Sequence, residues 1–237
     1  MISYKNLGEM GRLGNQLFQI ATTVALALRN NDKYVFPIWP EEKNFNLHNC
    51  FSSEINSNAE YREKDFRYIP IEYKQNLDLV GFFQSEKYFE DYKDMILRTL
   101  TPKVGYGMFS NTTSIHVRRG DYVNLSDHYV QLDADYYRKA MNMIKSEVYF
   151  MFSDDIAWCK SNFKDQNIVF IENNSPATDL AIMLGCEHNI IANSSFSWWG
   201  AYLNKNPSKI VVAPAEWFGP KLPHDTKDLL PEEWIKI

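Results

Sequence analysis

The sequence is poor in cysteine, in basic runs and in long apolar segments. Its three cysteines, Cys50, Cys159 and Cys186, form no CxxC pair, so they fit neither a disulfide framework nor a common structural zinc site. The net charge of -5 and the lack of a Lys/Arg-rich run argue against a protein that binds nucleic acid through its phosphates. No stretch reaches the roughly 18 apolar residues of a membrane span, and the first residues lack a signal-peptide core. We expect a cytoplasmic protein that touches the inner face of a membrane, if at all, peripherally through its substrate.

The second half of the chain predicts a parallel, doubly wound α/β sheet. Apolar and aromatic residues make up 45% of the 237 residues, enough for one large core or two smaller ones. Short, continuous apolar runs alternate with helical patterns, as is typical of strands covered on both faces. The predicted strands are 113–117, 148–152, 168–171, 189–192 and 210–213, and the predicted helices begin near Asp133 or Asp135, Ile156, Ser175 and Phe196.

The first half is less regular. A brief strand near 2–4, a glycine-bearing turn, a helix over 15–29 and a strand over 34–37 are followed by residues 41–76, which show no period. We expect this segment to contribute to a binding surface. A strand over 77–83 and a helix from Ser85 to about Leu100 follow. Pro102, Gly105 and Gly107 predict a domain boundary, which gives domains of residues 1–104 and 105–237.

Polar side chains follow four of the predicted strands. They are 116–121 (HVRRGD), 153–155 (SDD), 172–174 (ENN) and 193–195 (NSS). In open α/β sheets, ligands bind beyond the carboxyl ends of the strands. These segments therefore predict a pocket for a polar, anionic ligand.

Adjacent arginines at a strand end suit a diphosphate, because a guanidinium is always charged and offers a planar pair of donors. The alternative for Arg118 and Arg119 is a structural ion pair with Asp121. The carboxylates of Asp154 and Asp155 resemble a metal pair, but they equally suit a guanine edge, ribose hydroxyls or a helix N-terminus, and we predict no metal.

Two further segments resemble phosphate-contacting turns. Ser194-Ser195-Phe196 leads into a helix, where free N–H groups favour phosphate, although serines there are commonly caps. Residues 11–16 (GRLGNQ) follow the first strand and open a helix. They lack the third glycine of the dinucleotide fingerprint, and no acidic residue ends the next strand, which disfavours an NAD-dependent oxidoreductase.

Several motifs together resemble the bacterial α1,2-fucosyltransferases of glycosyltransferase family 11. They are GRLGNQLFQ at 11–19, GFFQSEKYF at 81–89, HVRRGDY at 116–122, FSDD at 152–155 and DLAIMLGCEHNIIANSSFSWWGAYLN at 179–204. The resemblance implies an α/β fold of GT-B type, with two Rossmann-like domains facing across a cleft. Residues 1–104 would be the acceptor-side domain and residues 105–237 the GDP-fucose-binding domain.

The same resemblance implies an inverting transfer of fucose from GDP-fucose to the 2-hydroxyl of a terminal galactose, with no metal or other cofactor. Arg118 would hold the β-phosphate, and His116 with Asp154 or Asp155 would meet guanine. Ser194, Ser195 and Phe196 would close around the nucleotide. Arg12, Gly14 and Asn15 would approach the sugar-phosphate from the other domain.

The residues leave the catalytic base and the acceptor open. Asp121 is a candidate base because it lies beside the phosphate motif, but it is equally a partner for Arg119, and Glu172 is a weaker candidate. Alternatives to this function are transfer with another linkage or another nucleotide sugar, and a nucleotide- or glycan-binding module without catalysis. The acceptor is a β-galactoside-terminated oligosaccharide or a lipid-linked glycan such as an O-antigen repeat. The oligomeric state is open.

Overall fold

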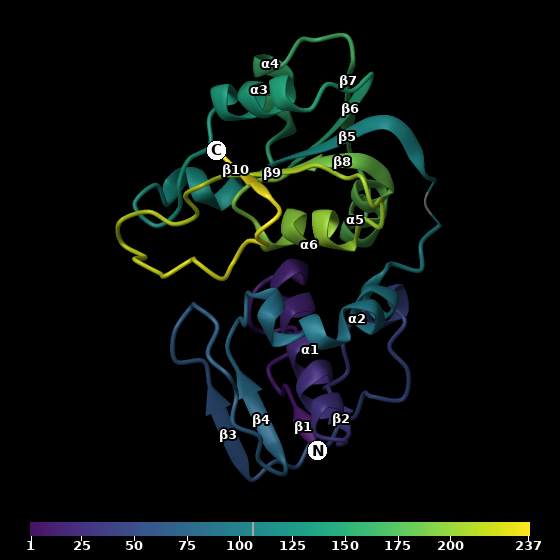
Figure 1. Cartoon of the computed structure of the whole chain (residues 1–237), viewed down its shortest axis with the longest axis vertical. Helices are drawn as coiled ribbons and strands as arrows, with labels where there is room; N and C mark the ends of the chain where they lie inside the picture. Colours follow the sequence, from purple (N-terminus) through teal and green to yellow (C-terminus); the bar gives the residue numbers. More distant parts are fainter. Residues whose placement is uncertain (106) are drawn as a thin grey trace. The chain divides into compact units, whose positions relative to one another are not determined.

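The computed structural model describes residues 1–105 and 107–237 and divides the chain into two compact units. The first unit contains Met1–Lys103 together with His224–Pro231, and the second contains Val104–Pro223 together with Glu232–Ile237. Each unit has its own parallel sheet, as Figure 1 shows. The segment His224–Pro231 packs with the first unit, partly through Asp228, which accepts from the Lys87 ammonium at 2.7 Å.

The first unit is built on a four-stranded parallel sheet with strand order β2-β1-β4-β3. Its helix α1 is buried along most of its length and packs on β1 and β2. The strands are β1 (Ile2–Ser3), β2 (Tyr34–Val35), β3 (Ala59–Arg62) and β4 (Leu77–Val80). The helices are α1 (Leu13–Arg29), the short 3-10 turns η1 (Glu42–Asn44), η2 (Glu86–Tyr88) and η3 (Glu90–Tyr92), and α2 (Lys93–Leu100).

Two sequence predictions in this unit differ from the structure. The predicted strand over 77–83 ends at Val80, and the chain then turns through Phe83, whose φ is 53°. Ser85 does act as a cap, but its hydroxyl accepts from the Lys87 N–H of η2, so the long helix predicted from Ser85 is wrong. Two 3-10 turns precede α2, and the buried Phe89 between them has a φ of -141°, outside the helical region. The aperiodic segment 41–76 also contains β3, which the sequence did not indicate.

The second unit contains a six-stranded parallel sheet with strand order β10-β9-β8-β5-β6-β7. The chain therefore runs outward from β5 through β6 and β7, returns past β5, and runs outward again from β8. This is the Rossmann order, in which ligands bind at the point where the direction reverses. That point lies between the carboxyl ends of β5 and β8. The strands are β5 (Phe109–Val117), β6 (Val148–Ser153), β7 (Ile168–Ile171), β8 (Cys186–Ile190), β9 (Val211–Ala213) and β10 (Ile235–Lys236).

Helices cover both faces of this sheet, with α3 and α4 on one face and α5 and α6 on the other (Figure 1). Their caps follow the sequence: the Asp133 carboxylate accepts from the first turn of α3, and the Ser175 hydroxyl accepts from the Thr178 N–H at 3.2 Å in α5. Trp198 and Trp199 of the helix that follows β8 are fully buried. The helices are η4 (Gly120–Asn124), α3 (Ala134–Met143), α4 (Ile156–Asn162), α5 (Pro176–Gly185) and α6 (Ser195–Leu203).

Across the two described ranges, none of the helices combines the length and the apolar character that a membrane crossing requires.

Candidate functional site

The reversal point of the second sheet places the polar segments after β5 and β8 on neighbouring strands. β5 pairs in parallel with both β6 and β8, so the residues after all three strands emerge at one edge. This edge carries Arg118 and Asp121 after β5, Asp154 and Asp155 after β6, and Ser194 and Ser195 after β8. The structure therefore brings together the strand ends that the sequence predicts to form a pocket.

Arg118 is held on three sides and is mostly buried, with 13% of its side chain exposed. One guanidinium nitrogen lies 2.7 Å from Asp154 Oδ2, and the other donates to Asp121 Oδ1. The ring of Tyr122 lies below the guanidinium, 4.8 Å from its central carbon. An arginine fixed in this way presents charge without the entropy cost of ordering a mobile side chain.

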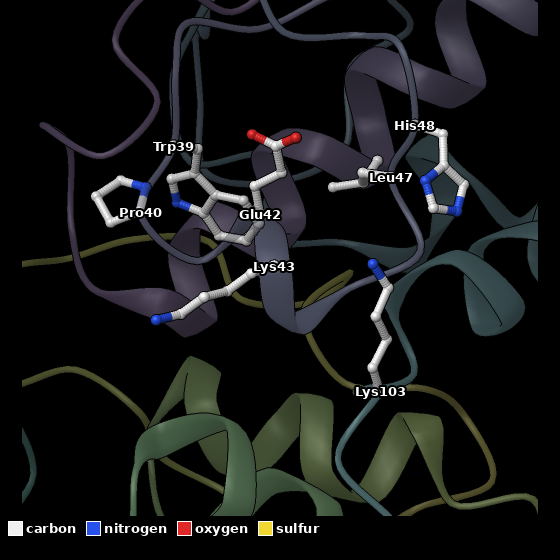
Figure 2. A pocket seen from close by; sticks show the side chains of 7 residues that line it. All are labelled: Trp39, Pro40, Glu42, Lys43, Leu47, His48 and Lys103. Carbon is white, nitrogen blue, oxygen red and sulfur yellow. The ribbon is translucent and has the colours of Figure 1, made fainter.

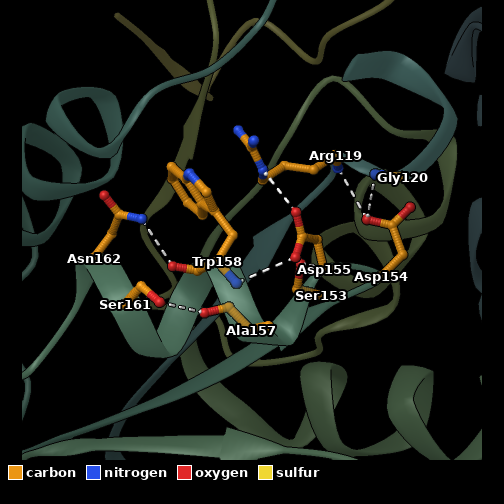
Figure 3. A network of polar contacts seen from close by, with 9 residues as sticks. All are labelled: Arg119, Gly120, Ser153, Asp154, Asp155, Ala157, Trp158, Ser161 and Asn162. Atoms are coloured by element: carbon orange, nitrogen blue, oxygen red, sulfur yellow. Dashed lines mark hydrogen bonds and ion pairs between the residues drawn. The ribbon is translucent and has the colours of Figure 1, made fainter. Parts of the chain in front are cut away.

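Asp154 joins the ends of β5 and β6. Its Oδ1 accepts from the backbone N–H groups of Arg119 at 2.9 Å and Gly120 at 3.2 Å, as Figure 3 shows. A β-carbon added at Gly120 would lie 2.3 Å from Asp154 Oδ2, so a larger residue there would displace the carboxylate. Asp154 therefore fixes both the Arg118 side chain and the turn that follows it.

Arg119 and Asp155 form a second pair beside this one (Figure 3). Arg119 Nε donates to Asp155 Oδ2 at 3.1 Å, and its guanidinium lies 4.2 Å from the centre of the Trp158 ring. Asp155 Oδ1 also caps α4 by accepting from the Trp158 N–H at 3.1 Å. The structural ion pair expected between the arginines and Asp121 thus forms at Arg118, and Arg119 pairs with Asp155 instead of Asp121.

His116 is the second-to-last residue of β5 and is buried beside the Phe196 ring, with 5.6 Å between the ring centroids. Burial lowers the pKa of His116 to about 4; Asp154 opposes this shift and Arg118 adds to it. Its Nδ1 is buried, with no hydrogen-bond partner among the described residues. The imidazole is therefore neutral near pH 7 and retains one unused polar atom next to Phe196.

The segment after β8 enters α6 through Ser194, which occupies the N-cap position without a side-chain cap bond. Asn193 lies immediately before it and donates to the carbonyls of Val130 at 3.0 Å and Trp217 at 2.9 Å. These bonds anchor the turn that positions Ser194, Ser195 and Phe196. The sequence indicates Asn193 only as part of the polar NSS segment and does not predict this anchoring role.

Tyr122 is the residue near Arg118 that the sequence reasoning missed. It stacks on Tyr129, with ring centroids 3.9 Å apart and planes 4° apart, and its hydroxyl reaches the Asn193 carbonyl at 3.4 Å. Tyr122 thus joins the segment after β5 to the segment after β8. Its place as the last residue of the HVRRGDY motif is the feature of the sequence that points to Tyr122.

In the first unit, Arg12, Gly14 and Asn15 lie together where the glycine turn enters α1. Gly11 has a φ of 77°, and a β-carbon there would lie 2.3 Å from Asn15 Nδ2, so the turn requires glycine. Asn15 Oδ1 accepts from Gln84 Nε2 at 2.7 Å, which ties the turn after β1 to the turn after β4. Arg12 is exposed at the N-cap of α1.

No group of three or more His, Cys, Asp or Glu side chains able to hold a metal ion occurs within residues 1–105 and 107–237. Asp154 and Asp155, the pair that resembled metal ligands, bind the two arginines and three backbone N–H groups instead.

A family model described as "Glycosyl transferase family 11" matches residues 6–237. The chain is 29% identical to an alpha-1,2-colitosyltransferase from Escherichia coli, and the match covers 96% of both proteins. It is 33% identical to the O-antigen biosynthesis glycosyltransferase WbnK from Escherichia coli, over 70% of this chain and 63% of that protein. It is 26% identical to galactoside alpha-(1,2)-fucosyltransferase 2 from Oryctolagus cuniculus, over 83% and 66% of the two chains.

Two solved structures share the fold. The alpha-1,6-fucosyltransferase NodZ, soaked with GDP-fucose, aligns with a TM-score of 0.55 at 12% identity over 85% of this chain and 91% of that one. POFUT1 in complex with GDP aligns with a TM-score of 0.54 at 14% identity over 90% and 97%. The predicted α/β fold of GT-B type, with a Rossmann-like sheet in each unit, is confirmed.

We predict that the buried, neutral His116 makes stability depend on pH. The unfolded chain takes up this proton near pH 6.5 and the folded chain near pH 4, so the contribution is complete above pH 6.5 and is lost as the pH falls toward 4. Between pH 7 and pH 4.5 the unaltered protein should lose roughly 2–3 kcal/mol more unfolding free energy than His116→Asn. Urea unfolding at both pH values measures this difference, and parallel pH dependence of the two proteins would contradict it.

Proposed function

Because the chain belongs to glycosyl transferase family 11, we propose that it transfers L-fucose from GDP-β-L-fucose to the 2-hydroxyl of a terminal β-galactose on a glycan. The names of its relatives support this activity: one is a galactoside alpha-(1,2)-fucosyltransferase and another an O-antigen biosynthesis glycosyltransferase. We place the reaction in the synthesis of O-antigen or another surface polysaccharide. The observation that carries the proposal is the fixed Arg118 guanidinium at the reversal point of a Rossmann sheet.

Arg118 acts on the leaving group. As the bond between fucose and the β-phosphate lengthens, negative charge grows on GDP and positive charge grows on the sugar ring. A fixed guanidinium gains most from that charge in the transition state, which accelerates the transfer. This role replaces the divalent ion that many nucleotide-sugar transferases use, so the reaction needs no metal.

The two carboxylates on Arg118 have different roles in this proposal. Asp154 also accepts two backbone N–H groups, so its position belongs to the fold. Asp121 is half-exposed, and among the described residues its carboxylate is bound only to Arg118. The incoming diphosphate therefore replaces Asp121 rather than Asp154.

Once replaced, Asp121 becomes available as the general base. The galactose 2-hydroxyl attacks the anomeric carbon from the face opposite the diphosphate, which inverts the configuration. Its proton passes to the Asp121 carboxylate, and GDP leaves with the electron pair of the broken bond.

The remaining predicted residues surround the donor. His116, with Phe196 beside it, contacts the guanine, together with Asp154 or Asp155. Ser194 and Ser195 contact the phosphates at the start of α6. Arg12, Gly14 and Asn15 of the first unit approach the sugar-phosphate. We still predict that residues 1–104 form an acceptor-side domain and residues 105–237 a donor-binding domain. We also still predict a cytoplasmic location.

The product linkage tests the proposal directly. The purified protein is incubated with GDP-fucose, EDTA and a panel of β-galactosides that includes lactose, and the product is analysed by NMR. We expect a Fucα1-2Gal linkage, formed at the same rate with and without EDTA. A different linkage, or a requirement for a divalent ion, would refute the corresponding part, and binding of GDP-fucose without transfer to any acceptor would favour the binding-module alternative.

A second donor is a specific candidate, because the relative that matches 96% of both chains is an alpha-1,2-colitosyltransferase. Colitose differs from L-fucose by the absence of the 3-hydroxyl. If the site donates or accepts a hydrogen bond at that hydroxyl, fucose is preferred, since a buried polar group would otherwise lose its partner. Competition between GDP-fucose and GDP-colitose for one acceptor distinguishes the two donors by their kcat/KM ratio.

Replacement of Arg118 should remove much of the catalysis without unfolding the protein. For Arg118→Ala we expect a loss of about 100- to 1,000-fold in kcat, the size of one preorganised donor to a developing anion. Arg118→Lys should recover part of the rate, because it keeps the charge without the planar pair of donors. Arg62→Ala, which removes an exposed arginine paired with Glu60, is the charge control and should leave kcat unchanged. A folded Arg118→Ala enzyme with near-normal turnover would refute the donor-site assignment.

The variant Asp121→Asn distinguishes between two roles of Asp121, as the general base and as the ion-pair partner of Arg118. Without a base, kcat should fall by about 100-fold or more, while the KM for GDP-fucose should not rise, because Arg118 becomes easier to reach. If Asp121 only positions Arg118, the variant would instead keep most of its kcat and raise the KM for the donor. Steady-state kinetics with varied GDP-fucose decide between these outcomes.

A further inference from the structure

A pocket of about 260 Å³ lies in the first unit, outside the residues assigned so far. Its apolar side is formed by Trp39 and Leu47, each 2% exposed. Its rim carries the charged side chains of Glu42, Lys43 and Lys103, with His48 beside them, as Figure 2 shows. Residues 42–48 belong to the segment 41–76 that the sequence predicted to form a binding surface.

The rim of this pocket is ordered by backbone bonds. The Lys103 N–H donates to the Asn44 carbonyl at 2.8 Å, and the Glu42 N–H donates to the Trp39 carbonyl at 3.1 Å. These bonds fix the base of Lys103 against the 3-10 turn η1, which carries Lys43. Trp39 stacks on Phe45 with ring centroids 5.5 Å apart, which holds the apolar wall in place.

The charges of the pocket favour an anion. The formal charges of two lysines and one glutamate sum to +1, in a chain whose net charge is -5. Figure 2 shows the Lys103 side chain extending toward His48 and the Glu42 carboxylate turned away from both ammonium groups. Lys43 and Lys103 form no ion pair with any described residue. Both are therefore available to an oxyanion, and the Glu42 carboxylate can accept from a sugar hydroxyl.

A single side chain connects the pocket wall to the glycine turn of the proposed reaction site. Gln16 Oε1 accepts from Trp39 Nε1 at 2.8 Å, and Gln16 Nε2 donates to the Gly11 carbonyl at 2.9 Å. Gly11 precedes Arg12, which the proposed function places near the transferred sugar. The side chain of Gln16 thus links the wall of the pocket directly to that turn.

We propose that this pocket binds an oxyanion carried by the acceptor, either a carboxylate on an acidic sugar or a phosphate that links the glycan to its carrier. The inference rests on the proposed function and narrows its acceptor class to anionic β-galactosides. Lys103 pairs with the oxyanion beside His48, and Lys43, on the other side of the pocket in Figure 2, adds a second positive charge at the rim.

The test compares three acceptors that share a terminal β-galactose: lactose, β-galactosyl-(1→4)-glucuronic acid, and lactosyl diphosphate. In the double variant Lys43→Ala/Lys103→Ala, the KM for the anionic acceptor that fits the pocket should rise roughly 3- to 30-fold, the size of two exposed ion pairs. The KM for lactose and for GDP-fucose should stay within twofold. The anionic acceptor whose KM rises in the variant shows whether the oxyanion is a sugar carboxylate or a linking phosphate. Added salt should raise the same KM in the unaltered enzyme.

Lys64→Ala/Lys74→Ala is the matched control, because it removes two exposed lysines of the same unit that lie outside the pocket. Equal KM values for anionic acceptors in the two double variants would overturn the inference while leaving the transferase activity standing. If the unaltered protein transfers fucose to no galactoside, the proposed function fails. Calorimetric titration with lactosyl diphosphate and with the glucuronide then tests the pocket separately, and binding that is unchanged by Lys43→Ala/Lys103→Ala refutes it.

Discussion

The Asp154 carboxylate is the contact on which the geometry after β5 depends. It comes from the end of β6, yet its three partners, the Arg118 guanidinium and the N–H groups of Arg119 and Gly120, all follow the neighbouring strand. A charged acceptor with three donors stays in place, because the loss of any donor would leave part of its charge unpaired in a partly buried site. The absence of a side chain at Gly120 follows from the same constraint, since the carboxylate occupies that space.

Most elements of the second unit could be predicted from the sequence, because continuous apolar runs and capping residues are local patterns. Ser175 with Pro176, and Asp133, mark helix starts that the structure confirms. The first unit was harder. Its strands are two to four residues long, and β3 alternates half-buried and exposed residues that include Glu60 and Arg62, so no apolar run marks it. The long helix expected after Ser85 was wrong because the Phe89 backbone, with a φ of -141°, leaves the helical region, although the buried residues of the segment keep helical spacing.

For the site, the sequence indicated which strand ends converge but not which side chains pair. Alternation along a strand predicts that one of two adjacent arginines faces the site, and it leaves the choice of carboxylate open. The structure assigns Asp121 and Asp154 to Arg118, and Asp155 to Arg119. The role of Tyr122 depends on its stacking with Tyr129, seven residues later, and on the Asn193 carbonyl beyond another strand. Such contacts depend on the strand order, so they cannot be predicted from the spacing of residues along the sequence.

In the first unit, as in the second, polar turns follow neighbouring parallel strands, but the strands are shorter. The order β2-β1-β4-β3 places the ends of β1 and β4 side by side, so its direction of winding also reverses at the turn that carries Arg12 and Asn15. Glu63 accepts from the Phe82 and Phe83 N–H groups, and burial raises the pKa of Glu63 to about 7. The Gly81 carbonyl after β4 accepts from the Tyr4 hydroxyl at 2.7 Å. Because each strand contributes few ladder bonds, these side-chain bonds position the turn, and Gln16 extends the same network to Trp39. The glycine turn and the wall of the pocket are thus parts of one hydrogen-bonded network within the first unit.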